Sequence, residues 1–289
     1  MPNLIVTNSS LSTFRACPRL YQLKYVDGYR PVENGEDLEL GTAMHYALES
    51  WWTDGDYDWA AARLAEKLTG LQLGKALTLM AGYHHRWLED RALYEVIGLE
   101  VPFSFRMPGM HGVRAAGKID GIVRRLSDDT IWIVEHKTTS SELAPGSTYW
   151  QRLGMDSQIS MYFDGAKSLG HDIAGCLYDV IGKPKLRGRQ NETPEQLGAR
   201  VAEEIIAAPE RYYQRSEIVR FEQELDESRA DVIQTTRLLR SGHKPRNVDS
   251  CLKYGNAKPC VFIEVCSGTA SLDDSSRFRH TDNVHPELT

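Results

Sequence analysis

The sequence lacks the marks of a secreted or membrane-spanning protein. Its start, MPNLIVTNSS, has no basic segment followed by a long apolar one, and no run of about 18 apolar residues occurs anywhere. Cysteine is scarce: five residues, an odd number, are poor material for a disulfide framework and better material for a metal site. We therefore expect a cytoplasmic protein with no membrane span or membrane partner.

The chain also lacks an excess of positive charge, since it has 34 Lys and Arg against 40 Asp and Glu, a formal charge of -6. This balance argues against a protein that coats nucleic acid by bulk charge, so any contact with DNA must be local. A phosphate-binding loop is missing too, because GLQLGKALT has Gly70 and Gly74 at the wrong spacing and Ala76 where Ser or Thr should follow Lys75. No motor is encoded, and strand separation would need a separate helicase as partner.

What is present indicates a folded α/β protein, because 289 residues with 41% hydrophobic content can bury a large core as one elaborated domain or two small ones. Residues 9–27 have a helical pattern that Pro18 should divide into two short helices at Cys17. Further helices are predicted over 38–52, 59–69, 75–92, 149–169, 194–207 and 226–240. Strands are predicted over 94–105, 113–126, 130–137, 173–181 and 211–225, the first three as an antiparallel meander.

Two carboxylates should meet on this meander. In the strand TIWIVEHK, residues alternate between faces, so Glu135 and Lys137 share one face and His136 lies on the other. The preceding strand, GKIDGIV, contains Asp120, and the turn at 127–129 makes the two strands neighbours. Carboxylates about 5 Å apart repel by about 3 kcal/mol at an effective dielectric near 20, so the pair would favour a bound cation. Oxygen ligands suit Mg²⁺ or Mn²⁺ better than Zn²⁺.

The Glu-x-Lys triplet has little value alone, because it arises by chance roughly once in such a chain and then marks an ion pair. The motifs around it make the signal specific. They are GTAMHYALE with His45, then Asp120 before the triplet, and Gln158 and Tyr162 after it, four residues apart on one helical face. This series resembles the RecB-like branch of the PD-(D/E)xK nucleases, especially the CRISPR-associated and phage exonucleases and the helicase-nuclease AddB. The resemblance covers about residues 9 to 268. It departs from the pattern at Ile119, where proline is usual.

The resemblance implies a role for each matching residue. His45, Asp120, Glu135 and the backbone carbonyl of His136 would bind the metal. Lys137 would contact the attacking water or the scissile phosphate, and Gln158 and Tyr162 would orient Lys137 or the DNA. These roles fit the chemistry, since a cation acidifies water and an ammonium neutralises a phosphate oxygen.

The resemblance also implies a fold and a domain plan. We expect a restriction-endonuclease-like α/β fold with a mixed central sheet flanked by helices. Residues 1–268 would form a single nuclease domain, with a helical elaboration over 38–92 and an iron–sulfur subregion from 1–30 and 243–268. The polar end, 269–289, would be a flexible tail.

The cysteines form a second constellation. The segment CLKYGNAKPCVFIEVC holds Cys251, Cys260 and Cys266, and Cys17 lies in the broken N-terminal helix. Clustered thiolates bind zinc or an iron–sulfur cluster, and the resemblance favours a four-iron cluster over zinc. The first two C-terminal cysteines are more widely spaced than in that pattern. Cys176, inside a strand, is interpreted as a core residue.

The resulting hypothesis is a Mg²⁺- or Mn²⁺-dependent DNA exonuclease that acts on single-stranded or duplex ends during recombination, repair or phage DNA processing, in a prokaryotic or phage-infected cell. Its partners would be DNA and a helicase or recombination protein. The alternatives are a catalytically idle DNA-binding scaffold with the same fold, and a PD-(D/E)xK endonuclease. The loop GKPKLRGRQ, which holds Lys183, Lys185, Arg187 and Arg189 and no acid, is either a phosphate clamp or a solvated loop.

Overall fold

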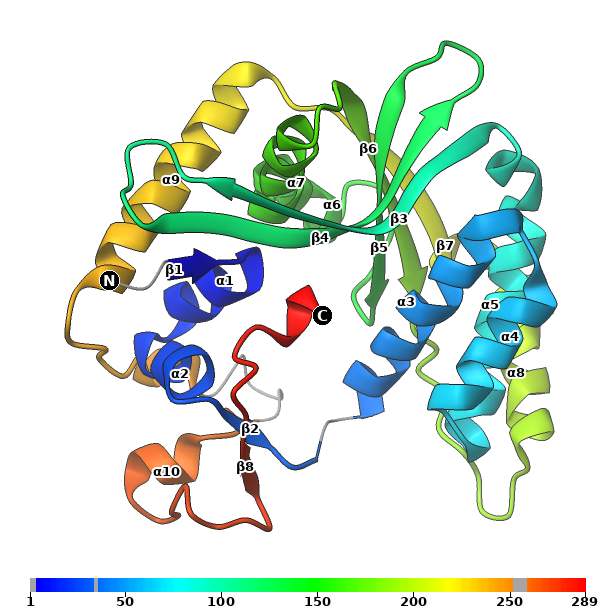
Figure 1. The fold of residues 1–289 in the computed structure, drawn as a ribbon. Helices are drawn as coiled ribbons and strands as arrows, with labels where there is room; N and C mark the ends of the chain where they lie inside the picture. Colours follow the sequence, from blue (N-terminus) through cyan, green and yellow to red (C-terminus); the bar gives the residue numbers. More distant parts are fainter. Residues whose placement is uncertain (1–3, 34–35, 252–258) are drawn as a thin grey trace. The chain divides into compact units, whose positions relative to one another are not determined.

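The computed structural model describes residues 4–33, 36–251 and 259–289. The chain forms two compact units, each assembled from separate segments (Figure 1). The first unit consists of Met1–Asn34, Pro102–Lys118 and Glu222–Thr289, and the second of Gly35–Val101 and Ile119–Phe221. Of the predicted iron–sulfur subregion, residues 1–3 and 252–258 lie outside the described residues.

One mixed sheet contains six strands: β1 (Leu4–Val6), β3 (Tyr94–Arg106), β4 (Val113–Arg125), β5 (Ile131–Thr139), β6 (Ile173–Gly182) and β7 (Tyr213–Ile218). The strand order is β1-β4-β5-β6-β7, and β3 also pairs with β4. β4 and β5 are antiparallel, as the meander predicts, whereas β5 and β6 are parallel and β6 and β7 antiparallel. The prediction of a mixed central sheet is therefore confirmed.

Helices cover both faces of the sheet in the second unit. On one side lie α3 (Glu36–Asp54), α4 (Tyr57–Lys67), α5 (Gly70–Arg91) and α8 (Pro194–Ala207) (Figure 1). Their buried side chains, such as Trp51, Leu79 and Val201, join Val134 and Leu177 of the sheet in one large core cluster. The segment predicted as a helical elaboration therefore supplies much of this unit's core. On the other side, α7 (Ser157–Ser168) packs against β6.

The helix predicted over 149–169 is divided. α6 (Thr148–Gln151) and a 3-10 turn (Arg152–Met155) precede α7. Asp156 is extended, and its carboxylate accepts hydrogen bonds from the backbone N–H groups of Gln158 and Ile159. These two N–H groups would bond to carbonyls of the preceding turn in an uninterrupted helix. Because Asp156 caps them instead, α7 starts as a separate helix at Ser157. Gln158 and Tyr162 keep their predicted place on one helix.

The first unit begins with α1 (Asn8–Ala16) and α2 (Pro18–Tyr21). Pro18 separates them, as predicted: Cys17 has φ −159° and ψ 112°, and Pro18 occupies the first turn of α2. A π-helical turn (Gln22–Val26) follows α2.

The predicted strand 211–225 is wrong beyond Ile218. A helix, α9, begins at Glu222 rather than 226 and runs to Arg240, and Glu222 and Glu224 in its first turn favour this early start.

The C-terminal segment differs from the predicted flexible tail. After α10 (Ile263–Ser267), the strand β8 (Phe278–His280) pairs with β2 (Tyr29–Pro31) in a small antiparallel sheet. Phe278 is buried and stacks on Phe262, with ring centroids 5.3 Å apart, and both pack against Leu23. The packing of Phe278 therefore fixes a C-terminal segment whose composition is mostly polar.

Among the helices of the described residues, none has the length and apolar character that a membrane span requires.

Candidate active site

The two predicted carboxylates meet where β4 and β5 pair. The register places Gly121 opposite Val134, so the residues beside them, Asp120 and Glu135, face each other. The backbone N–H of His136 donates to Oδ2 of Asp120 at 2.8 Å. Glu135 is 1% exposed, and the side chain of Asp120 is 13% exposed. The convergence expected from the turn and the strand period is present.

Helix α3 brings His45 to the same place. Its Nδ1 atom lies 3.4 Å from Oδ2 of Asp120. Burial, with smaller contributions from Lys137 and His136, lowers the pKa of His45 to about 4. The imidazole is therefore neutral near neutral pH, which is the form that can bind a cation.

Lys137 links the carboxylates to α7. Its Nζ atom donates to Oε1 of Glu135 and, at 3.0 Å, to Oε1 of Gln158. Gln158 in turn donates from Nε2 to the Tyr162 hydroxyl at 2.8 Å. Burial alone would lower the pKa of Lys137, but the carboxylates of Glu135 and Asp120 raise it, so the ammonium stays charged. The structure thus joins the predicted Gln-x-x-x-Tyr pair to Lys137 through one hydrogen-bonded chain.

The surroundings of Glu135 and Asp120 disfavour their charged forms, and a bound cation would offset this. Burial and the neighbouring Asp120 raise the pKa of Glu135 to about 7, and burial raises the pKa of Asp120. Oε2 of Glu135 is buried and has no hydrogen-bond partner among the residues that the structure describes. Buried carboxylates with a free oxygen and a neutral imidazole nearby form a donor set suited to a divalent metal. Among the described residues, however, no group of three His, Cys, Asp or Glu side chains already stands at metal-binding spacing.

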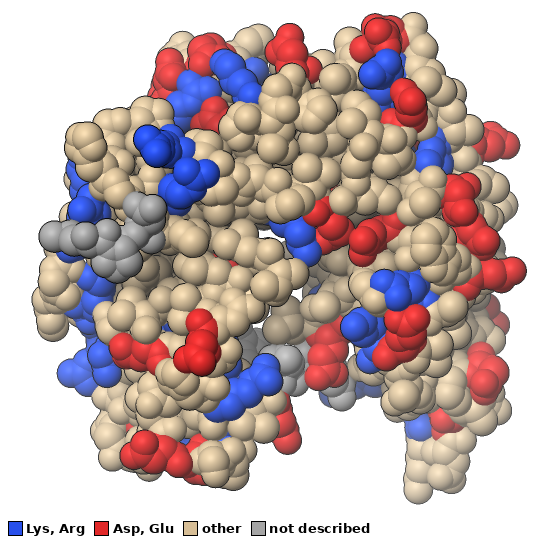
Figure 2. Space-filling model, viewed as in Figure 1, with Lys and Arg blue, Asp and Glu red and all other residues tan. Residues whose placement is uncertain are grey.

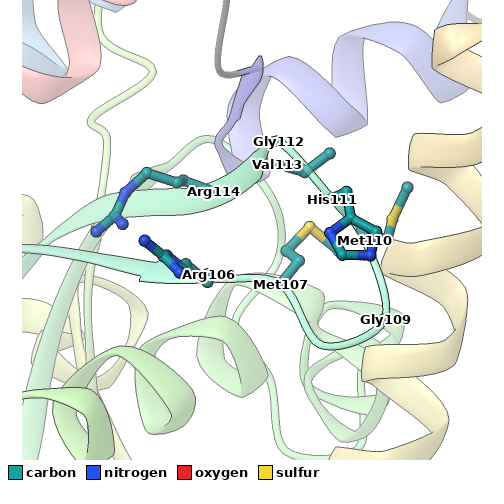
Figure 3. Close-up of a pocket in the computed structure, with 8 residues that line it drawn as sticks. All are labelled: Arg106, Met107, Gly109, Met110, His111, Gly112, Val113 and Arg114. Carbon is teal, nitrogen blue, oxygen red and sulfur yellow. The ribbon is translucent and has the colours of Figure 1, made fainter.

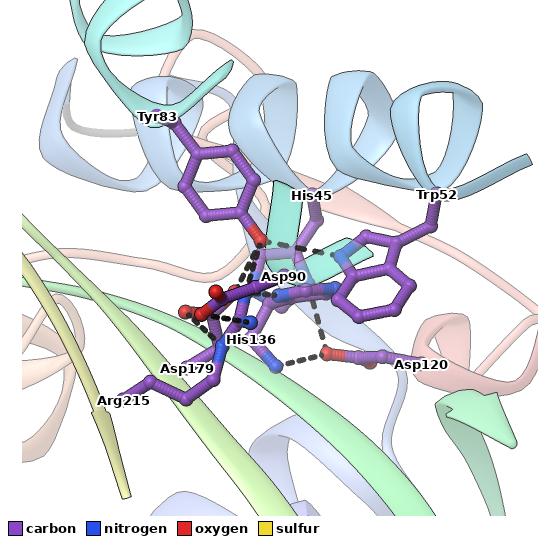
Figure 4. Close-up of polar contacts among 8 residues, drawn as sticks. All are labelled: His45, Trp52, Tyr83, Asp90, Asp120, His136, Asp179 and Arg215. Carbon is purple, nitrogen blue, oxygen red and sulfur yellow. Dashed lines mark hydrogen bonds and ion pairs between the residues drawn. The ribbon is translucent and has the colours of Figure 1, made fainter. Parts of the chain in front are cut away.

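A buried ionic network lies behind the site, and sequence reasoning missed it (Figure 4). Nδ1 of His136 lies 3.2 Å from Oδ2 of Asp179. That oxygen also lies 3.3 Å from Nη2 of Arg215 and accepts a hydrogen bond from the Tyr83 hydroxyl. The Nε1 atom of Trp52 donates to the same hydroxyl at 3.2 Å. The network fixes the His136 side chain on the face of β5 that faces away from Glu135 and Lys137.

Charge pairing dominates this network. Burial alone would raise the pKa of Asp179, but Arg215 and His136 lower it to about 2. The available signal was an acid inside the apolar strand CLYDVIG, since a buried charge needs a partner. The partners, Tyr83 and Arg215, come from α5 and β7, so no local pattern could identify them.

The four candidate cluster ligands all lie in the first unit, and all five cysteines are free thiols. Burial, and then the neighbouring Cys260 and Cys17, raise the pKa of Cys251. Burial, followed by Cys260, likewise raises the pKa of Cys266, with smaller effects from Cys17 and Cys251. The backbone N–H of Cys260 donates to the carbonyl of Cys251 at 2.8 Å. The thiols are thus near enough to interact electrostatically, although within the described ranges they are not at ligand spacing. Cys176 is fully buried in β6, in the second unit.

Two hollows elsewhere do not contain the carboxylates. One, of about 410 Å³, lies at the turn between β3 and β4 in the first unit. There Arg106 and Arg114 extend to one side and Met107, Met110 and His111 lie at the turn (Figure 3). The other, of about 910 Å³, lies between α5 and α8. On the face drawn in Figure 2, basic and acidic side chains are interspersed, so no uniform basic field covers the described part of that face.

The chain is similar to several known proteins. The model of the PD-(D/E)XK nuclease superfamily matches residues 6–267. One of the subunits of the ATP-dependent helicase/deoxyribonuclease of Ruminiclostridium cellulolyticum is 22% identical over 248 residues, covering 69% of this chain and 21% of that protein. The chain thus spans about a fifth of the length of this curated relative.

A crystal structure of a "Putative exonuclease" from Eubacterium rectale superposes with a TM-score of 0.52 at 12% identity, covering 92% of this chain and 94% of that one. At this identity the likeness concerns the fold alone, and it supports the mixed sheet flanked by helices.

Proposed function

Because the chain belongs to the PD-(D/E)XK nuclease superfamily, we propose that it is a divalent-metal-dependent DNA exonuclease. The observation that carries the proposal is the convergence of Asp120, Glu135 and Lys137, with one buried carboxylate oxygen left without a partner among the described residues. A protein that only binds DNA has no need to bury two carboxylates against each other and an ammonium beside them. The family-level activity is phosphodiester hydrolysis, and DNA ends are the proposed substrate.

The residues divide the work. His45, Asp120, Glu135 and the carbonyl of His136 would hold Mg²⁺ or Mn²⁺, which supplies charge for the phosphate and acidifies the attacking water. The charged ammonium of Lys137 is held by Glu135 and Gln158, where it can neutralise a phosphate oxygen. Tyr162 holds Gln158, so the Lys137 position is set in advance of DNA binding.

We propose the biological setting from the relatives that this chain resembles. One of them is a subunit of a helicase/deoxyribonuclease, which supports a role in recombination, repair or phage DNA processing and a separate helicase as partner. We also propose that Cys17, Cys251, Cys260 and Cys266 bind an iron–sulfur cluster, with zinc as the alternative. This rests on the family resemblance of the four cysteines, one near the N-terminus and three near the C-terminus, and on the electrostatic proximity of the thiols.

The test uses end-labelled linear DNA and purified protein with Mg²⁺, Mn²⁺ or EDTA. We expect cation-dependent shortening of linear DNA and no cleavage of a covalently closed circle. Asp120→Asn, Glu135→Gln and Lys137→Ala should each lower the rate by at least about 100-fold without changing the far-UV circular dichroism. Full activity in EDTA, or in Lys137→Ala, contradicts the site. Equal cleavage of closed and linear single strands would favour the endonuclease alternative, and no cleavage of any DNA would favour the idle scaffold.

A further inference from the structure

The basic loop between β6 and α8 begins at the strand end that carries the candidate site (Figure 1). β6 runs parallel to β5, with Gly182 paired to Thr139, two residues after Lys137. The backbone N–H of Lys183 donates to the Thr139 carbonyl at 2.7 Å. The loop therefore starts within a few residues of the proposed catalytic ammonium.

Helix α3 contacts the same place. A Cβ atom added to Gly41 would lie 3.0 Å from the Thr138 hydroxyl and 3.9 Å from Nζ of Lys183. Gly41 precedes His45 by four residues, about one helical turn. The Lys183 ammonium thus lies beside the helix that carries a proposed metal ligand.

The loop is anchored along one side and exposed along the other. Pro184 is buried, and Leu186 packs against the core cluster of the second unit. At Gly188 a Cβ would lie only 2.4 Å from a Leu71 methyl group, so the backbone approaches α5 closely there. Between these anchors, Lys185 and Arg187 are exposed. Their fixed backbone lowers the ordering cost of a contact to a ligand.

The charges of the loop are not equivalent. Oε2 of Glu192 accepts a hydrogen bond from the backbone N–H of Arg189 at 2.7 Å, and its Oε1 pairs with Arg200 at 2.6 Å. Arg189 therefore has an acid beside it. Lys185 and Arg187 form no hydrogen bond or ion pair with any residue that the structure describes. They are two uncommitted cations on an anchored segment of a net acidic chain.

We propose that Lys185 and Arg187 bind backbone phosphates of the DNA strand that enters the candidate site. Together with Lys183, which lies at the end nearest Lys137, they form a basic strip. The proposal rests on the proposed function and adds to it a DNA-binding surface. Phosphate contacts are independent of base sequence, which suits a nuclease that digests a strand progressively. A protein without bulk positive charge needs such a local surface.

The test measures binding of a fluorescent single-stranded oligonucleotide, without divalent cation, at 50 to 200 mM salt. The Lys185→Ala/Arg187→Ala protein should have a salt slope smaller by about 1.4, or about 0.7 per lost contact. Over this fourfold range of salt, the wild-type protein should lose affinity about sevenfold more than the variant. With a duplex oligonucleotide, where the slope is about 0.9 per contact, the loss of the same two contacts should make the slope smaller by about 1.8.

Two variants control the test. Lys167→Ala/Arg237→Ala removes the same two residue types at exposed positions of α7 and α9 and should leave the slope unchanged. Lys185→Arg/Arg187→Lys keeps the charges and should retain the wild-type slope. If the loop variant keeps the wild-type slope, or the distant pair lowers it equally, the strip is refuted while metal-dependent cleavage still supports the nuclease. Wild-type protein that neither binds nor cleaves DNA would instead overturn the proposed function.

Discussion

Replacing Asp179 by Asn should destabilise the second unit strongly. Asp179 is 1% exposed and pairs with Arg215, whose guanidinium lies 4.1 Å from the Trp87 ring centroid and 5.6 Å from that of Trp52. Asn keeps the shape but removes the charge. Among the described residues, Arg215 then keeps one ion pair, a 3.9 Å contact to half-exposed Asp90, and a 3.3 Å hydrogen bond to the Tyr83 hydroxyl. Breaking a buried pair on one side costs about 3–5 kcal/mol, and the Asp90 contact places this case near 3 kcal/mol.

The measurement is urea unfolding followed by tryptophan fluorescence. All six Trp residues lie in the second unit, so the fluorescence signal comes from side chains of that unit. With a typical urea slope of about 2 kcal/mol per M, a loss of about 3 kcal/mol lowers the midpoint by about 1.5 M. The slope itself should not change, because the unfolding surface is the same.

Two comparisons make the result decisive. The double variant Asp179→Asn/Arg215→Met removes both charges and should lose less than the sum of the single variants, because no charge stays buried alone. Glu66→Gln breaks a surface pair with Arg63, whose atoms are 3.0 Å apart, and should cost less than about 0.5 kcal/mol. A loss below about 1 kcal/mol for Asp179→Asn, or additive single variants, would refute the network as an electrostatic unit.

Two further predictions concern the second unit. Tyr162→Phe removes the acceptor of the 2.8 Å hydrogen bond from Gln158 and should lower the cleavage rate about fivefold, since a hydrogen bond contributes about 1 kcal/mol. Gln158→Ala should lower the rate further. Equal rates for the wild-type protein and both variants would contradict the hydrogen-bonded link from Tyr162 through Gln158 to Lys137. Gly175→Ala places a Cβ 2.3 Å from the Trp132 ring and should cost about 1–3 kcal/mol in the urea assay, whereas Gly154→Ala, with no described atom within 4 Å, should cost less than about 0.5 kcal/mol. If both glycine variants unfold at the same urea concentration, β6 is not packed closely on Trp132.

Local patterns predicted the elements that carry the site. Alternation along a strand is fixed by backbone geometry, so Glu135 and Lys137 fell on one face without any tertiary information. The short turn after β4 likewise made Asp120 a neighbour of β5. His45 could not be derived in this way, because a lone histidine in a helix has no local mark, and only the family resemblance singled it out.

The remainder depended on contacts between distant segments. The Asp179 network joins β5, β6, β7 and helices α3 and α5, and its geometry exists only after these elements pack. Strand β8 is held by Phe278, which packs against Phe262 and against Leu23 from the other end of the chain. The early start of α9 had a local signal, because the acidic pair Glu222 and Glu224 lies in its first turn, but the predicted strand over 211–225 extended across these residues.

The cysteines lead to a prediction about stability. A ligand bridge from Cys17 to Cys251 would close a loop of about 234 residues, for which the chain-entropy model of cross-links gives about 5 kcal/mol. This is comparable to the whole stability of a domain, so the cluster should matter for folding more than for cleavage. An iron–sulfur cluster would colour the protein brown. Replacing Cys17, Cys251, Cys260 or Cys266 by Ala should therefore remove this colour and lower the melting temperature of the first unit. The Cys176→Ala protein, whose substitution lies in the second unit, should retain its full iron content. Protein purified without oxygen that contains stoichiometric zinc and no iron or sulfide would refute the cluster, whereas unchanged melting of all four variants would refute the cross-link itself.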